Sequence, residues 1–128
     1  MLMKNVLNIA LLSITILLSG TVVSGQVKTE SDSILVINAV INQENKAELQ
    51  GYLNQMMQVF KDNGGKPVAR YKAVENILGD NSPEMVAIIS FPDSQTIKDM
   101  INGEDYISLT ELRSRVFEKL NLIICSGL

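Results

Sequence analysis

The sequence of 128 residues contains no histidine, no tryptophan and one cysteine, Cys125. Without histidine, the chain lacks the side chain that most often transfers protons near neutral pH and most often binds metal ions. A single thiol can form neither an intramolecular disulfide nor a zinc cluster of cysteines. We therefore expect no metal site and no cofactor, and we interpret Cys125 as a small buried hydrophobic residue.

Basic residues are also few and scattered. Eleven Lys and Arg residues stand against 14 Asp and Glu, which gives a formal net charge of −3 without any basic stripe. A surface that binds nucleic acid would need such a stripe, so we expect no nucleic-acid partner. Hydrophobic residues make up 46% and charged residues 20% of the chain, which is typical of a globular protein. The length indicates one domain.

The first 25 residues have the pattern of an export signal. Lys4 precedes an apolar stretch at 6–18, and small residues follow at 23–25. A signal peptidase reads small residues at such positions, so we expect cleavage between Gly25 and Gln26. Because no cysteine follows the apolar stretch, it is not a lipoprotein signal.

Cleavage would make the protein periplasmic or secreted, with no stable membrane association. The alternative is an uncleaved N-terminal membrane anchor, but the apolar segment is at the short end of the roughly 20 residues that a span requires. Residues 26–33 are polar and non-periodic, and we interpret them as a flexible segment. The folded domain is then expected over 34–128.

Runs of apolar residues separated by turn-forming residues predict the order of the elements. We expect a strand at 34–41, a helix from an Asn42 cap to about Asn63, an extended segment at 68–78, a strand at 84–91, a short helix from an Asp93 cap to Gly103, a helix over 106–120 and a last strand at 122–125. Gly64 and Gly65 supply the left-handed end of the long helix. The order β-α-β-β-α-β, with its second helical region broken in two, predicts an α+β fold of the ferredoxin-like class with an antiparallel sheet.

The first and third predicted strands are apolar on both faces. In a ferredoxin-like domain the helices cover one face of the sheet, and a face left to water should carry alternating polar residues. The second face therefore needs a cover, and the chain has no further segment to supply it. A second copy of the chain is the simplest cover, so we predict a homodimer whose sheets pack face to face.

Several short motifs occur in an order that resembles a known family. They are Gly64-Gly65-Lys66-Pro67-Val68-Ala69-Arg70, Glu75, Gly79, Phe91-Pro92-Asp93, Asp105-Tyr106, Leu112-Arg113 and Gly127. Together they resemble the domain-of-unknown-function family 1330 (DUF1330) over about 34–128. The resemblance implies a dimeric α/β barrel, the superfamily to which DUF1330 is assigned, and it implies no particular reaction. Ser90, Met100 and Asn63 stand where that family usually has Glu, Trp and His.

Four residues are candidates for ligand binding: Asn38, Arg70, Tyr71 and Arg113. Arg70 follows the Gly-Gly turn on an apolar strand, where its cation could meet a carboxylate or enolate. We favour a structural ion pair for Arg70 instead, with Glu75 or with an acidic residue across the dimer. Asn38 interrupts an apolar strand, and a buried amide needs partners that a ligand or water can supply.

The remaining candidates also have structural interpretations. For Arg113, which the family resemblance singles out, we favour a salt bridge to Glu104 or Asp105. Tyr71 and Tyr52 could each place a hydroxyl in a pocket, although Tyr52 lies on the apolar stripe of the long helix and is interpreted as a core residue.

Three hypotheses for function follow. The first is an exported dimer that binds a small apolar or amphipathic molecule between its sheets. The second is a cofactor-independent enzyme resembling a monooxygenase or an isomerase of the dimeric-barrel superfamily. Members of that superfamily that hold haem through histidine are excluded, because this chain has none. The third is a purely structural dimer with a filled barrel.

Overall fold

A computed structural model describes residues 32–80 and 82–128; the predicted signal peptide and most of the predicted flexible segment lie outside these residues. The described elements are β1 (Ser33–Ile41), the short 3-10 helix η2 (Gln43–Asn45), α2 (Lys46–Asp62), β2 (Lys66–Lys72), β3 (Met85–Phe91), α3 (Ser94–Ile101), α4 (Glu104–Ile107), α5 (Thr110–Val116) and β4 (Phe117–Cys125). None of the helices in this part of the chain is long and apolar enough to cross a membrane.

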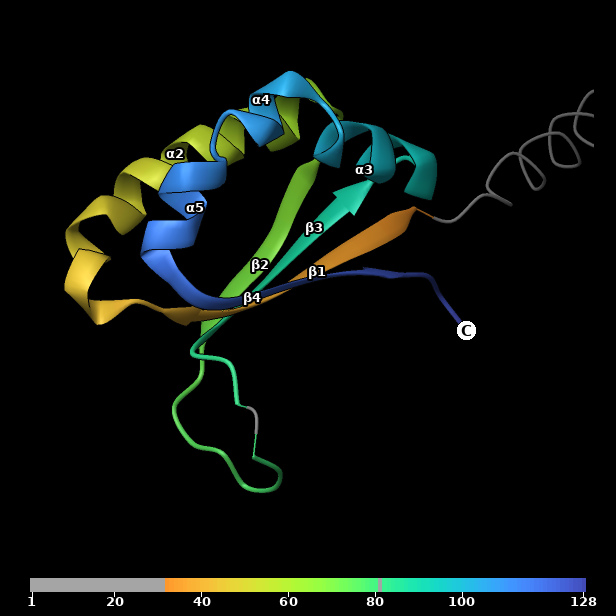
Figure 1. Cartoon of the computed structure of the whole chain (residues 1–128). Coiled ribbons are helices and arrows are strands. Elements are labelled where there is room, and N and C mark those ends of the chain that lie inside the picture. Colours follow the sequence, from red (N-terminus) through yellow and green to blue (C-terminus); the bar gives the residue numbers. More distant parts are fainter. Residues whose placement is uncertain (1–31, 81) are drawn as a thin grey trace, which may run out of the picture. The chain divides into compact units, whose positions relative to one another are not determined.

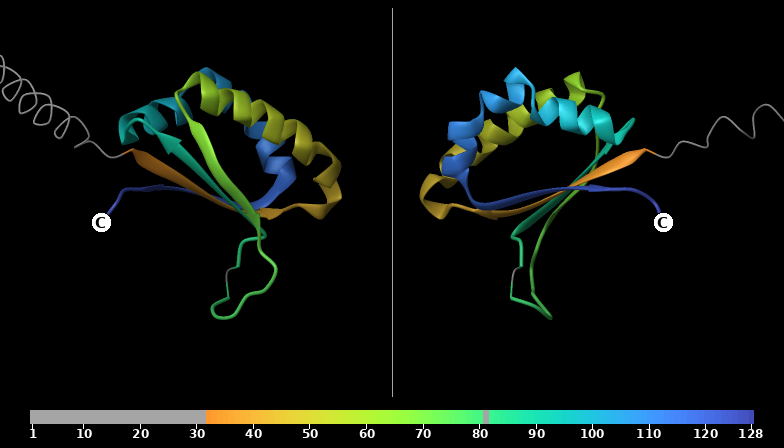
Figure 2. Two further views of the ribbon diagram at one scale, coloured as in Figure 1. Left: turned by 180° about the vertical axis from the view of Figure 1, so that it is seen from behind. Right: turned by 45° about the vertical axis from the view of Figure 1, so that its right-hand side comes forward.

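The four strands form one antiparallel sheet in the order β2-β3-β1-β4. The helices of residues 32–80 and 82–128 lie on one face of this sheet, and no other element of these residues covers the opposite, open face (Figures 1 and 2). The predicted α+β fold with ferredoxin-like strand order is thereby confirmed.

Strand β1 shows why the sequence folds in this way. Leu35, Ile37 and Ala39 are buried and face the helices, whereas the intervening residues are only partly buried on the open face. Across the ladder, Leu35 pairs with Ile89 and Ile37 pairs with Ala87, so buried residues meet buried residues. β-Branched side chains suit such a pleated surface. The core therefore lies between the helices and one face of the sheet.

The predicted helix signals are present. The Asn42 side chain accepts a hydrogen bond from the backbone N–H of Glu44 at the start of η2. The Asp93 carboxylate accepts one from the backbone N–H of Thr96 at 2.7 Å and so caps α3. At the end of α2, Gly64 has a φ of +79°, the left-handed conformation that glycine adopts most easily.

The second strand is shorter than the sequence suggested. We predicted an extended segment at 68–78, but β2 covers Lys66–Lys72. Lys72 pairs with Met85, the first residue of β3, so the residues after Lys72 have no neighbouring strand. They form a loop instead, and its Val74 and Ile77 are 93% and 90% exposed.

The last strand begins earlier than predicted. We expected one helix over 106–120, but the structure has two short helices there, α4 and α5, and α5 ends at Val116, directly before β4 begins at Phe117. The apolar spacing of Val116 and Leu120 fits a helix, yet Leu120 lies opposite Ala39 in the sheet. Pairing with β1 satisfies the backbone of these residues and turns Leu120 toward the core, so the tertiary contact decides the conformation.

Candidate functional site

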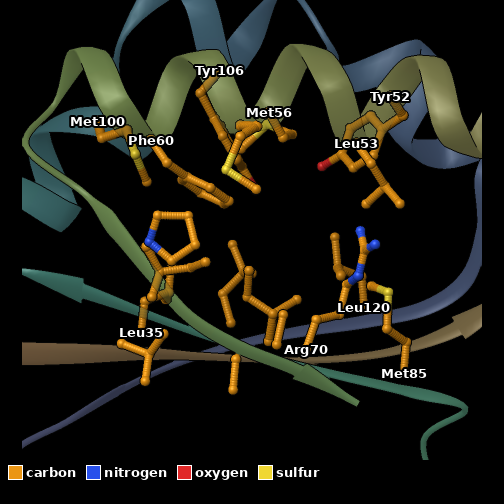
Figure 3. A pocket seen from close by; sticks show the side chains of 18 of the residues that line it. Leu35, Tyr52, Leu53, Met56, Phe60, Arg70, Met85, Met100, Tyr106 and Leu120 are labelled. Carbon is orange, nitrogen blue, oxygen red and sulfur yellow. The ribbon is translucent and has the colours of Figure 1, made fainter. Parts of the chain in front are cut away.

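A cavity of about 330 Å³ lies between α2 and the helix-covered face of the sheet (Figure 3). Leu35, Ile37 and Ala87 from the central strands form part of its floor. Met56 and Phe60 lie opposite them on α2. This volume is at the lower end of the range for small-molecule sites, about 300–1,000 Å³.

The edge strand β2 forms one side of the cavity opening. A register shift between Pro67 and Ala69 gives β2 one extra residue, Val68, relative to β3. Such a bulge changes the direction of side chains, and Pro67, Val68 and Arg70 all line the cavity while remaining exposed. Leu53, half-buried on α2, lines it as well. A ligand can therefore enter between α2 and β2.

Most of the lining is apolar. The three lining residues with polar side chains are Tyr52, Arg70 and Tyr106. The Tyr52 hydroxyl points into the cavity from α2, and the Arg70 guanidinium points into it from the sheet (Figure 3). Among the residues that the structure describes, no cluster of His, Cys, Asp and Glu could hold a metal ion.

Arg113, on α5, holds both tyrosines of the cavity. Its Nε donates a hydrogen bond to the Tyr52 hydroxyl at 3.0 Å, and its Nη2 donates one to the backbone carbonyl of Tyr106 at 2.7 Å. The guanidinium also lies 3.7 Å from the centroid of the Tyr106 ring, in cation–π contact. The ring of Phe117 packs edge-on against Tyr52, with 5.2 Å between centroids.

Burial raises the pKa of the Tyr52 hydroxyl, although the hydrogen bond from Arg113 acts in the opposite direction. Burial likewise raises the pKa of Tyr106. A phenol already titrates near pH 10 in water. Both hydroxyls are therefore protonated near neutral pH and can donate hydrogen bonds.

The structure changes the interpretation of both arginines. Within residues 32–80 and 82–128, the only ion pair joins Arg115 to Glu48, at 3.1 Å. The favoured ion pair of Arg70 with Glu75 is therefore not formed, and Arg70 lines the cavity instead. The expected salt bridge of Arg113 to Glu104 or Asp105 is also wrong. Its donors instead reach Tyr52 on α2 and Tyr106 on α4.

Asn38 and Tyr71 lie on the open face of the sheet, away from this cavity. In the sheet register, Asn38 pairs with Val86 and Asn121, and Tyr71 also pairs with Val86. Tyr71 is 60% exposed. The cavity of the single chain is thus on the opposite side of the sheet from the space between two sheets that the sequence suggested. Arg70 alone among the four predicted residues lines it.

Cys125 is on the same open face, where it pairs with Ile34. It is only half-buried and lies outside the core. The interpretation of Cys125 as a buried core residue therefore needs correction. Strand β4 is at the edge of the sheet, and its outward side chains have no covering layer in the described chain.

Sequence reasoning missed the contact between Tyr52 and Arg113. The two residues are 61 positions apart, so no local spacing connects them. Tyr52 has the position of an ordinary core residue on the apolar stripe of α2. The one available signal was that a buried tyrosine needs a hydrogen-bond partner.

The comparisons with known proteins agree with this architecture. A family model described as "Domain of unknown function (DUF1330)" matches residues 33–128. A protein of unknown function from Rhodopseudomonas palustris has a similar structure, with a TM-score of 0.65 and 19% identity, covering 77% of this chain and 84% of its own. The search among curated proteins found no significant match.

Two further solved structures are similar. One is a DABB family protein with a ferredoxin-like fold from Mesorhizobium loti, with a TM-score of 0.58 and 12% identity, covering 77% of this chain and 99% of its own. The other, from Nitrosomonas europaea, is described as a candidate antibiotic biosynthesis monooxygenase; its TM-score is 0.52 and its identity 8%, covering 76% of this chain and 90% of its own. At these identities the likeness shows a shared fold.

Proposed function

The chain belongs to the DUF1330 family of domains of unknown function, and on that premise we propose that it binds a small amphipathic molecule between α2 and the sheet. The observation that carries this proposal is the apolar cavity of about 330 Å³ with Arg70 at its opening. An apolar body would occupy the interior, where burial of apolar surface stabilises binding. A polar group would remain at the opening.

Arg70 determines which polar group fits best. Its guanidinium has no ion-pair partner among residues 32–80 and 82–128, and it points into the opening (Figure 3). A guanidinium pairs well with a carboxylate, through two parallel hydrogen bonds. The ligand we propose therefore has an anionic group at one end.

Binding is better supported than catalysis. The described lining has no nucleophile beside a general base, because its polar side chains are one arginine and two tyrosines. The alternative is cofactor-independent oxidation or isomerisation of the bound molecule. It rests on a fold shared with proteins such as the candidate monooxygenase from Nitrosomonas europaea, and a fold hosts many unrelated functions.

Titration with two linear probes tests the binding proposal. We expect decanoate and 1-decanol both to bind saturably, because both place the same chain in the cavity. Arg70→Met should weaken decanoate about 2- to 5-fold, the range for a partly solvated ion pair, and should leave 1-decanol nearly unchanged. Lys72→Met is the matched control, because Lys72 is an exposed cation on the same strand that does not line the cavity.

If neither decanoate nor 1-decanol bound saturably, the proposed function would be overturned. Equal losses of decanoate affinity in Arg70→Met and Lys72→Met would remove Arg70 from the site, because the effect would then be one of net charge. Mass spectrometry of small molecules extracted from the purified protein would identify a natural ligand, and conversion of that ligand on incubation would support the enzymatic alternative.

We also propose that two copies of the chain associate through their open faces. Val36, Val40 and Ile88 lie on this face and remain partly exposed, and Ile123 is 44% exposed. No helix of the described chain covers them (Figure 2). Such a contiguous apolar surface is typical of an interaction site. Light scattering should give the mass of a dimer at micromolar concentration, and a monomeric mass would refute the proposal.

Export remains a proposal based on residues 1–25. Expression of the full chain in a host with a periplasm should yield a protein in the periplasmic or secreted fraction. Its first residue should be Gln26, as determined by N-terminal sequencing. An intact N-terminus in the membrane fraction would support the anchored alternative instead.

A further inference from the structure

The Tyr52 hydroxyl is a hydrogen-bond donor without an acceptor inside the described domain. Its oxygen accepts the hydrogen bond from Arg113 Nε at 3.0 Å. A phenol can donate one hydrogen bond as well as accept. Among residues 32–80 and 82–128, no oxygen or nitrogen accepts a bond from this hydroxyl. The proton of Tyr52 is therefore free to be donated to a molecule in the cavity.

The Tyr52 hydroxyl is positioned to bind a ligand in the cavity. Tyr52 is 5% exposed, and its hydroxyl points into the cavity rather than into solvent (Figure 3). Phe117 packs against its ring, and Arg113 fixes its oxygen. The Tyr52 hydroxyl therefore donates its hydrogen bond in one direction, and the acceptor atom of a ligand must lie in that direction. Arg113 lies outside the lining, so we regard it as a positioning residue.

The lining as a whole offers more donors than acceptors. Arg70 can only donate, the oxygen of Tyr52 already accepts a hydrogen bond from Arg113, and the protonated Tyr106 hydroxyl can donate as well as accept. The hydrogen of an alcohol would need an acceptor in turn, and the Tyr106 hydroxyl is the one lining side chain whose oxygen accepts no hydrogen bond within the described residues. A ketone, ester or amide oxygen accepts without donating, and it suits a cavity of this kind.

Resting on the proposed function, we infer that the ligand carries a carbonyl-type oxygen on its buried part, and that this oxygen accepts a hydrogen bond from the Tyr52 hydroxyl. The ligand class is thus an apolar carbonyl compound with an anionic group at its exposed end. Arg70 recognises the charged end and Tyr52 recognises the buried oxygen. The high pKa of the buried phenol keeps it protonated for this role near neutral pH.

A matched pair of probes isolates the buried hydrogen bond. 1-Acetylnaphthalene and 1-ethylnaphthalene have nearly the same shape, and only the ketone has an acceptor. We expect Tyr52→Phe to lower the ratio of ketone affinity to hydrocarbon affinity about 3- to 10-fold, the range for one neutral hydrogen bond. Tyr71→Phe should leave the ratio unchanged, because Tyr71 is 60% exposed and does not line the cavity.

A spectroscopic measurement on the unmodified protein provides a second test that does not depend on the folding of a variant. The ¹³C resonance of a labelled carbonyl moves downfield when its oxygen accepts a hydrogen bond. We expect this shift for 1-acetylnaphthalene in the complex, and we expect it to disappear in Tyr52→Phe. A carbonyl resonance in the complex that matches the one in an apolar solvent would overturn the inference.

The outcomes separate the inference from the proposed function. If both probes bind and Tyr52→Phe leaves their affinity ratio unchanged, the assignment of Tyr52 is wrong while the binding function stands. If decanoate binds but neither naphthalene does, the inference is overturned while the binding function stands; if decanoate and 1-decanol also fail to bind, both are overturned. Loss of the ketone preference in Tyr52→Phe together with the carbonyl shift supports both.

Discussion

Replacing Gly65 with alanine should destabilise the domain, although Gly65 has no unusual backbone angle. A Cβ atom at this position would lie 2.7 Å from Cζ of Phe91 and 2.8 Å from the backbone oxygen of Phe60. Neither neighbour can retreat easily. The oxygen of Phe60 accepts the hydrogen bond of the Gly65 N–H at 2.7 Å, and Phe91 is 1% exposed. The Phe91 ring also packs edge-on against Phe60, with 6.1 Å between centroids.

The expected cost is about 1–3 kcal/mol, the range for overpacking a dense core. For a domain of this size, each 1 kcal/mol lowers the melting temperature by roughly 4–8 °C. Gly51→Ala is the matched control, because it makes the same substitution inside α2 where no atom lies within 4 Å of the new Cβ. It should stabilise the protein by about 0.5–1 kcal/mol, since alanine is the better helix former.

Urea unfolding of both variants, followed by circular dichroism, measures the two changes on one scale. Opposite signs for Gly65→Ala and Gly51→Ala are the expected result. If Gly65→Ala were as stable as the unmodified protein, the close approach of Gly65 to the two phenylalanines would be wrong. Phe60 also lines the cavity, so Gly65→Ala should in addition weaken binding of decanoate.

Three further predictions concern single side chains. Arg113→Met should lower the free energy of unfolding in urea by about 1–3 kcal/mol, because the Tyr52 hydroxyl and the Tyr106 carbonyl lose their hydrogen-bond donor. An unchanged free energy of unfolding would show that these bonds are not formed. Ile88→Lys should produce a monomer by light scattering, because it places a charge in the centre of the open face; an unchanged dimer would place the interface elsewhere. The hydrogen bond from the Thr96 backbone lowers the pKa of Asp93, so its contribution to stability should be present above the unfolded-state pKa and be lost as the pH falls through the lower folded-state value. Asp93→Asn should lack that acid-dependent loss in unfolding measured across pH 2–6, roughly the range of a carboxyl titration.

Much of the fold was predictable because its signals are local. The signals of β1, the caps and the helix end each depend on a few neighbouring residues: the run of mostly β-branched apolar residues in β1, the Asn42 and Asp93 caps and the left-handed Gly64. The ends of β2 and β4 were wrong for the opposite reason. β2 ends at Lys72 because β3 has no residue to pair with the next one. The end of β2 therefore depends on the length of another strand, which the local sequence of β2 does not show.

The candidate site was predictable only in part. The Gly-Gly turn identified the strand that carries Arg70, but the sequence suggested a ligand space between two sheets, whereas the cavity that Arg70 lines is on the helix-covered side of the sheet. The cavity is lined by both α2 and the exposed strand β2, so its existence depends on how the helix packs against the sheet. The contact between Tyr52 and Arg113 depends on the same packing, and the composition of either helix does not reveal it.

The central position of β1 also constrains how the domain folds. Ile34 pairs with Cys125, so the first described strand receives one of its two neighbours from the last. Contacts between distant parts of a chain require large loops to close, which slows folding. Until β4 is available, β1 is an unpaired edge that can join a wrong strand. A chain truncated before Phe117 should therefore aggregate rather than form a smaller stable domain.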